Sequence, residues 1–394
     1  MQKKSTVGLY SGIIITFLIL SIIDYSGDLH LGQHDKINNY RLIEDLIRQG
    51  ISALIFIIGI LGFLNIFTIK KIKSIGVLCI ACTLLVLIYT FVNGILSNNL
   101  VHAIRESLPA IVLLLIPLLI KINTIQRDKL GTYFLYLLVI IAAIKIIVIQ
   151  FVAINIYGSL SWKVLLRLSP VLILPYCYFL LNILRGQASR LDYIYLMVVI
   201  VEILIANARA LNLILLIATF IILSTSKISI KLLAVVCIIA ISACFSMIAT
   251  DGSIDNVFGI WTGEHLENTV NHRLIQLEII LNRFLDNPIF GFGFGYFTPG
   301  YDSYADLALP YLLELDLLNF FTKAGIPMSI LYLFSYFLII FQHIKNRDHG
   351  SNIEYSYLLS LILLLVYSLF QTAHSSFIFW LLYAFTFSFI FRKS

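Results

Sequence analysis

The chain has 394 residues, of which 60% are hydrophobic and only 12% are charged. A soluble globular domain carries about 25% charged residues, and this chain adds repeated apolar runs of about 20 residues, the length that crosses a bilayer. The composition therefore excludes a water-soluble enzyme and predicts that the lipid bilayer is a partner of the chain. The net charge of +6 does not indicate nucleic-acid binding, because the basic residues follow the topology described below.

Hydropathy predicts an all-α polytopic fold with about twelve transmembrane helices in a single integral membrane domain, residues 1–394. The first nine predicted spans are Val7–Ile23, Ile51–Ile69, Ser74–Val92, Arg105–Ile120, Gly131–Ile154, Arg167–Leu184, Leu191–Ala206, Arg209–Ser224 and Lys231–Ala249. The last three are Leu317–Phe341, Tyr355–Phe370 and His374–Phe391. No small-residue cleavage site follows the first span, so we expect a retained anchor and not a signal peptide.

Charge supports this number of spans, because every second connection is basic and a missed span would disturb the alternation. The basic side receives Lys3, Lys4, Lys70, Lys71, Lys73, Lys121, Arg127, Lys129, Arg185, Arg190, Lys227, Lys231, Lys345, Arg347, Arg392 and Lys393. By the positive-inside rule this side is the cytoplasm. Both termini are therefore predicted to be cytoplasmic, in a bacterial inner (cytoplasmic) membrane.

A large extracytoplasmic loop, residues 250–316, is predicted between helices 9 and 10. It is too long to be a simple connection, and it contains an amphipathic stretch at 272–285. At 100° per residue, His272, Gln276 and Arg283 fall on one face, with Arg273 beside them and apolar residues over much of the rest. We expect this helix to lie at the outer membrane surface.

Five arginines are predicted at the outer ends of helices or in the large loop, where topology alone would not place them: Arg105, Arg167, Arg209, Arg273 and Arg283. A guanidinium group stays charged and binds phosphate through two hydrogen bonds, so these residues are candidates for an anion site. The alternative is that they reach lipid headgroups or pair with carboxylates of the loop. Arg105, beside Glu106, fits that alternative best, whereas Arg209 and Arg273 favour the anion site.

Two further charges lie inside predicted spans. Glu202 precedes Arg209 by seven residues and shares its face if the helix continues. A carboxylate in the membrane is costly and indicates a functional site by default, although Glu202 could simply neutralise Arg209. Lys145 has the same two interpretations, a functional charge or one that reaches water.

The end of the large loop is acidic, with Glu314 and Asp316 at the outer mouth of span ten. A carboxylate there could act as a general base toward a sugar hydroxyl, or the cluster could only oppose nearby arginines. Upstream, Gly291–Gly295 alternates glycine with phenylalanine. No strand precedes it, so it is not a dinucleotide-binding motif but a flexible or tightly turned loop.

From Arg273 to Gly325 the chain resembles the superfamily of O-antigen polymerases and O-antigen ligases. The family pattern is an arginine, a helical stretch, a P-x-x-G-x-G-x-x-x-F turn, and then H/E-x-x-x-L-x-x-x-x-x-x-G. These elements correspond here to Arg273, Pro288–Phe297, and Glu314 with Leu318 and Gly325. The family's upstream Ser-Arg element is matched only by Arg209. Ligases usually carry histidine where this chain has Glu314, which favours the polymerase.

The resemblance implies a metal-independent glycosyltransferase that takes glycans from undecaprenyl diphosphate at the outer face of the inner membrane, with no cofactor and no metal site. Glu314, Arg273 and Arg209 would be catalytic. The substrate-binding residues would be Arg283, His272, Arg167 and Asp316. A chain-length regulator is a further candidate partner. The alternatives are an O-antigen ligase, or a flippase or transporter of lipid-linked oligosaccharide; the last usually shows two related halves, which this sequence lacks.

Overall fold

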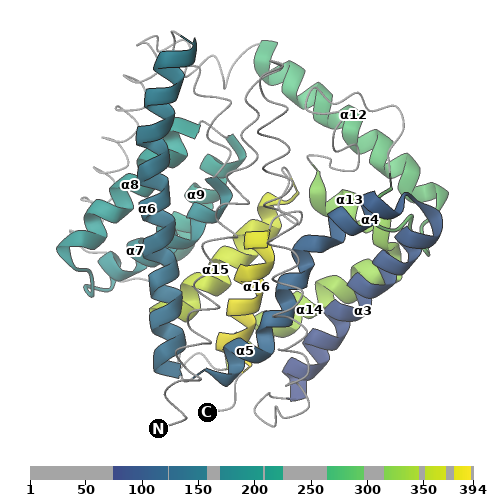
Figure 1. Cartoon of the computed structure of the whole chain (residues 1–394), viewed down its shortest axis with the longest axis horizontal. Helices are drawn as coiled ribbons and strands as arrows, with labels where there is room; N and C mark the ends of the chain where they lie inside the picture. Colours follow the sequence, from purple (N-terminus) through teal and green to yellow (C-terminus); the bar gives the residue numbers. More distant parts are fainter. Residues whose placement is uncertain are drawn as a thin grey trace. The chain divides into compact units, whose positions relative to one another are not determined.

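The computed structural model describes residues 74–122, 124–157, 169–206, 209–224, 264–296, 315–345, 351–369 and 377–391. Every regular element in these ranges is an α-helix or a 3-10 helix, and none of them is a strand (Figure 1). The all-helical fold class is therefore confirmed for this part of the chain. The predicted spans Val7–Ile23, Ile51–Ile69 and Lys231–Ala249 lie outside the described residues.

Two described helices are long and apolar enough to cross a membrane, α3 (Ser74–Ser97) and α14 (Ile326–Lys345). Each exposes large apolar side chains along its length, such as Leu85 on α3 and Ile330 on α14. A helix that exposes such residues is stable where lipid covers them. Four shorter apolar segments lie in other helices: Pro170–Leu184, Leu213–Ser224, Asn352–Tyr367 and Phe379–Ile390. These features fit a helical membrane protein.

The chain divides into two compact units. The first unit contains α6 (Thr124–Tyr157), the 3-10 helix η5 (Ser169–Leu172), α7 (Ile173–Leu184), α8 (Arg190–Ala206), α9 (Arg209–Ser224) and most of α15 (Asn352–Tyr367). The second unit contains α3, α4 (Leu100–Ser107), the 3-10 helix η3 (Leu108–Leu115), α5 (Ile116–Lys121), most of α12 (Glu264–Asp286), α13 (Asp316–Ala324), α14 and α16 (Phe377–Ile390).

The first unit is built around α7, whose residues are almost all buried. Aromatic rings of α6, α7 and α8 pack together, with the centroids of Tyr136 and Tyr195 5.3 Å apart and those of Phe179 and Tyr195 5.5 Å apart. The start of α15 is held by polar contacts, since the Asn352 side chain donates to the Oδ1 atom of Asn182 at 2.7 Å. The first unit therefore combines an apolar interior with a hydrogen-bonded end.

In the second unit α3 packs along α14, and α16 packs against η3 and α5. A buried set of hydroxyl groups joins α3, α14 and α16. The Tyr383 hydroxyl of α16 lies 2.7 Å from that of Thr83 on α3, which in turn donates to the carbonyl of Cys79 at 3.1 Å. On α14 the hydroxyls of Tyr332 and Tyr336 are 2.9 Å apart. Polar side chains that bond across apolar helices fix how those helices pack.

Three predicted spans are not single α-helices, and one of them is Arg167–Leu184, whose described part is divided between η5 and α7. Arg105–Ile120 is divided among α4, η3 and α5, because Pro109 lies in the first turn of η3 and proline cannot supply a backbone hydrogen-bond donor inside a helix. Leu317–Phe341 is divided at Gly325, which has a φ of 77°, a backbone conformation that ends an α-helix. The prediction of one continuous helix was wrong for Leu317–Phe341, whereas Arg105–Ile120 and the described part of Arg167–Leu184 stay helical and change between α and 3-10 geometry.

The other described spans are helical close to their predicted bounds, and α9 has the predicted bounds, Arg209–Ser224. The helix α6 extends beyond the predicted Gly131–Ile154 at both ends. The amphipathic helix predicted at 272–285 is confirmed as α12, which begins earlier, at Glu264.

Candidate functional site

The Pro/Gly-rich segment after α12 forms a tightly turned loop, residues 287–296, which we call the glycine loop. Gly291, Gly293 and Gly295 have φ values of 66°, 77° and 77°, a region that is accessible to glycine and costly for other residues. A helix precedes the loop and not a strand. The predicted tight turn is therefore confirmed, as is the exclusion of a dinucleotide-binding motif.

The main chain of the glycine loop is bonded on two sides. The amide of Gly293 donates to the carbonyl of Lys323 on α13 at 2.9 Å, and the amide of Phe294 donates to the carbonyl of Thr90 on α3 at 3.0 Å. A Cβ atom on Gly293 would overlap the backbone of Gly94 on α3. Glycine at both positions therefore lets the loop backbone lie directly against the helix backbone.

Two asparagines near the end of α3 bind the carbonyl groups of the glycine loop. The Asn93 side-chain amide donates to the carbonyl of Gly291 at 3.1 Å, and that of Asn98 donates to the carbonyls of Phe292 and Phe294 at 2.6 and 3.1 Å. Because buried backbone groups are costly when unbonded, these contacts hold an irregular loop at the end of an apolar helix.

A buried ion pair lies beside the same loop. The ammonium group of Lys323 on α13 contacts the Oε1 atom of Glu106 on α4, and the Lys323 side chain is 0% exposed. The other carboxylate oxygen of Glu106 accepts a hydrogen bond from the amide of Gly295 at 2.7 Å. The Asp316 carboxylate lies near enough to act electrostatically on Glu106. Two carboxylates and one ammonium group are thus gathered at the glycine loop.

The helix α12 packs its apolar face on the start of α13. Ile280 and Leu315 are buried against each other, with Leu277 and Leu318 packed around them. In Figure 1, α4, α13 and the end of α12 lie around the upper end of α3. The helix that carries Arg273 and Arg283 therefore contacts the segment that leads from Glu314 into α13.

The structure describes the side chains of only two predicted site residues. Asp316 is the first residue of α13 and is buried. Arg283, in the last turn of α12, forms an ion pair with Asp286 at 3.2 Å, and its side chain is 39% exposed. Asp316 lies next to the contact between α12 and α13, whereas Arg283 remains accessible.

The remaining predicted site residues are placed only by their backbone or not at all. Arg273 and His272 are in α12, and Arg209 is the first residue of α9 in the first unit; their side chains lie outside the described part of the structure. Glu314 and Arg167 lie outside the described residues altogether. The helix α8 ends at Ala206, so Glu202 and Arg209 belong to different helices and do not share one continuous face.

An aromatic pair lies at the end of the glycine loop. The rings of Phe292 and Tyr296 are stacked, with centroids 4.2 Å apart and an interplanar angle of 19°. Burial raises the pKa of the Tyr296 phenol above 10, while the charge of Arg283 lowers it by a smaller amount. The phenol is therefore neutral at physiological pH and can donate a hydrogen bond.

Sequence reasoning missed the part that Glu106 and Lys323 play at this site. Both lie within spans predicted from hydropathy, where a charge is costly. The rule that singled out Glu202 and Lys145 applies equally to them.

Within the described ranges no group of three histidine, cysteine, aspartate or glutamate residues could hold a metal ion.

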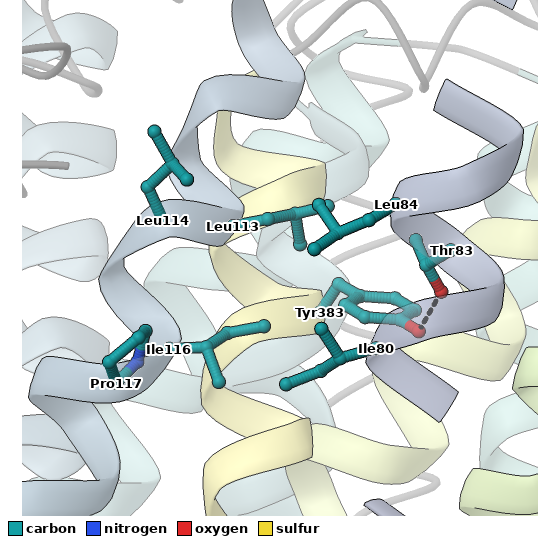
Figure 2. Close-up of a pocket in the computed structure, with 8 residues that line it drawn as sticks. All are labelled: Ile80, Thr83, Leu84, Leu113, Leu114, Ile116, Pro117 and Tyr383. Carbon is teal, nitrogen blue, oxygen red and sulfur yellow. Dashed lines mark hydrogen bonds between the residues drawn. The ribbon is translucent and has the colours of Figure 1, made fainter. Parts of the chain in front are cut away.

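A small apolar pocket lies elsewhere in the second unit, among α3, η3, α5 and α16. Figure 2 shows the Tyr383 hydroxyl at this pocket hydrogen-bonded to Thr83. The other lining residues are Ile80, Leu84, Leu113, Leu114, Ile116 and Pro117. The lining carries no charge, so this pocket offers apolar contact and no chemistry.

The chain matches no protein-family model, no curated protein and no solved structure. Function is therefore inferred from the residues between Arg273 and Gly325 and from their geometry.

Proposed function

We propose that this chain is an inner-membrane glycan polymerase of the O-antigen or capsular type. It transfers a growing glycan from undecaprenyl diphosphate to a lipid-linked repeat unit at the outer face of the membrane. The proposal includes twelve spans, cytoplasmic termini and the extracytoplasmic loop at 250–316. The basic residues in every second connection support this topology.

One observation supports the proposal: the described parts of the motif at 273–325, namely α12, the glycine loop and α13, pack against one another. The helix that bears the arginines packs through Ile280 on Leu315, and the glycine loop bonds to α13 and α3. A site for a charged lipid-linked substrate needs cationic and acidic groups held at fixed positions. The arrangement supplies that framework at the end of an apolar helix, where such a substrate would enter.

In the proposed reaction a hydroxyl oxygen of the acceptor sugar attacks the anomeric carbon of the donor glycan. The bond from that carbon to the diphosphate oxygen breaks, the anomeric configuration inverts, and undecaprenyl diphosphate leaves with the electron pair. Glu314 orients the hydroxyl and takes its proton. The new glycosidic bond therefore forms at the expense of the bond to diphosphate, and no oxidant or reductant is needed.

Arginine would supply the positive charge for this reaction. Arg273 and Arg209 would bind the diphosphate and stabilise the charge that develops on it, since guanidinium stays charged and matches phosphate geometry. Arg283, His272, Arg167 and Asp316 would bind the substrates around them. Arg283 is exposed enough to meet a substrate, and Asp316 lies at the start of α13.

The proposal is tested by replacing Arg273 with Ala and resolving the surface glycan on a gel. The variant should make no long polymer while reaching the membrane at the normal level, because only the anion contact is lost. Arg273→Lys should recover part of the activity, since lysine keeps the positive charge but cannot form the bidentate hydrogen bonds of a guanidinium group. The matched control on the same helix is Glu278→Gln, at an exposed position. Full-length polymer from Arg273→Ala would contradict the proposal.

A further inference from the structure

The buried ion pair between Glu106 and Lys323 has no part in the chemistry proposed above. It nevertheless joins α4, α13 and the glycine loop. Lys323 holds the loop through its main chain, where its carbonyl accepts from Gly293 at 2.9 Å. It also holds the loop through its side chain, because its ammonium group binds Glu106 and Glu106 accepts from Gly295 at 2.7 Å.

A buried ion pair is a costly way to hold two elements together. A buried ion pair loses its hydration, and apolar residues of similar volume often stabilise a fold as well or better. The junction is already closely packed, since a Cβ atom on Gly295 would come within 2.5 Å of the Ala103 backbone nitrogen on α4. Packing alone could therefore hold α4 and the loop together. The ion pair also fixes the orientation of the loop relative to α13. One oxygen of the Glu106 carboxylate binds Lys323 on α13, and the other binds the loop at Gly295.

We propose that Glu106 and Lys323 are positioning residues that hold the glycine loop, and through it the end of α12, in register with α13. The glycine loop continues directly from α12, whose last residue is Asp286. The position of the loop therefore contributes to the position of Arg283, in the last turn of α12, relative to Asp316 at the start of α13. A loosened loop would separate the anion-binding arginines from the proposed base. The catalytic consequence rests on the proposed function, whereas the claim that the ion pair holds the glycine loop does not depend on it.

The experiment compares two double variants of the full-length protein. Glu106→Leu with Lys323→Met replaces both charges by apolar groups and removes the acceptor for Gly295. Glu106→Gln with Lys323→Met also removes the charges but keeps a side-chain oxygen that can accept from Gly295. Both should accumulate better than the single variants, because neither member of the ion pair is left buried without the other. Each single variant should accumulate poorly, because one buried charge is left without its partner.

Two readouts are taken. Amide hydrogen exchange across 287–296, in purified protein, should be at least about tenfold faster in the Leu/Met variant, with the Gln/Met variant in between. Polymer length in cells should follow the same order, with none in Leu/Met and shortened polymer in Gln/Met. The control, Glu278→Gln with Lys129→Met, makes similar changes at exposed positions and should match wild type in both readouts.

The inference is overturned if the Leu/Met variant exchanges like wild type. It is overturned equally if the loop exchanges faster but the polymer is unchanged, since the pair would then be structural only. Failure of the proposed function has a different signature. Deletion of the whole chain would leave the glycan unchanged, while the exchange measurement would still report whether the ion pair holds the loop.

Discussion

At the scale of single residues, the site depends on glycines and charges that an apolar sequence would otherwise avoid. Lys323 is fully buried against Glu106, and three glycines of the glycine loop adopt positive φ. Each feature is costly alone. Together they let a loop backbone lie against α3, α4 and α13 and satisfy its amides there.

Gly293→Ala tests this packing. Alanine at a φ of 77° is strained, and its Cβ would overlap the backbone of Gly94. We expect a loss of about 2 kcal/mol or more of folding free energy, together with loss of polymer. The measurement is thermal unfolding of the purified protein. Ile289→Ala is the control, because Ile289 belongs to the same loop and is 58% exposed. Equal stability of the two variants would show that the loop does not need glycine at 293.

At the scale of elements, the second unit is held by hydroxyl groups as well as by apolar contacts. The hydroxyls of Thr83 and Tyr383 lie 2.7 Å apart, and Thr83 also donates to the carbonyl of Cys79. This short chain of hydrogen bonds joins α16 to α3. In an apolar setting a hydrogen bond between helices adds a modest amount to the free energy of folding and fixes how the helices pack.

Tyr383→Phe removes one hydroxyl from this chain and keeps the ring. We expect it to lower the free energy of unfolding by about 1 kcal/mol, because Thr83 then loses its hydrogen bond to Tyr383. Tyr133→Phe serves as the comparison, since Tyr133 is 61% exposed and should show no change. Unfolding of both proteins in mild detergent by increasing denaturant gives the measurement. A Tyr383→Phe protein as stable as the Tyr133→Phe protein would show that the hydrogen bond between Tyr383 and Thr83 does not stabilise the fold.

Hydropathy was sufficient to predict the helical class, the bounds of α9 and the start of α3, since a long apolar run has few other ways to satisfy its backbone. It could not predict the change to a 3-10 helix near Pro109 or the end of α13 before Gly325, because the apolar run continues through both positions. The tight turn at Gly291–Gly295 was predictable because its residues are local in sequence.

The partners of that turn were not predictable. Glu106 and Lys323 are 217 residues apart, and Asn98 binds a carbonyl at Phe292 that is 194 residues away. Contacts at this separation leave no periodicity or spacing in one sequence. The cost of a charge in an apolar span was the available signal, and it would have indicated Glu106 and Lys323 as residues that need partners.

At the scale of the whole molecule, the proposed polymerase combines a helical framework with a charged site that we place at the outer face of the membrane. The framework supplies α3 and α14, which are apolar enough to cross a membrane, and the motif supplies the arginine-bearing α12 with its glycine loop. A polymerase of lipid-linked glycans needs both parts, because its donor has an apolar chain and a charged diphosphate. The central claim is that this chain joins repeat units to one another.

Deletion of the gene, followed by resolution of the surface glycan on a gel, tests that claim most directly. We expect loss of the long ladder while a single repeat unit stays attached to its acceptor. Loss of all attached glycan, with lipid-linked polymer accumulating at the outer face, would identify a ligase instead. Repeat units trapped on the cytoplasmic side would identify a flippase. An unchanged ladder would contradict the account entirely.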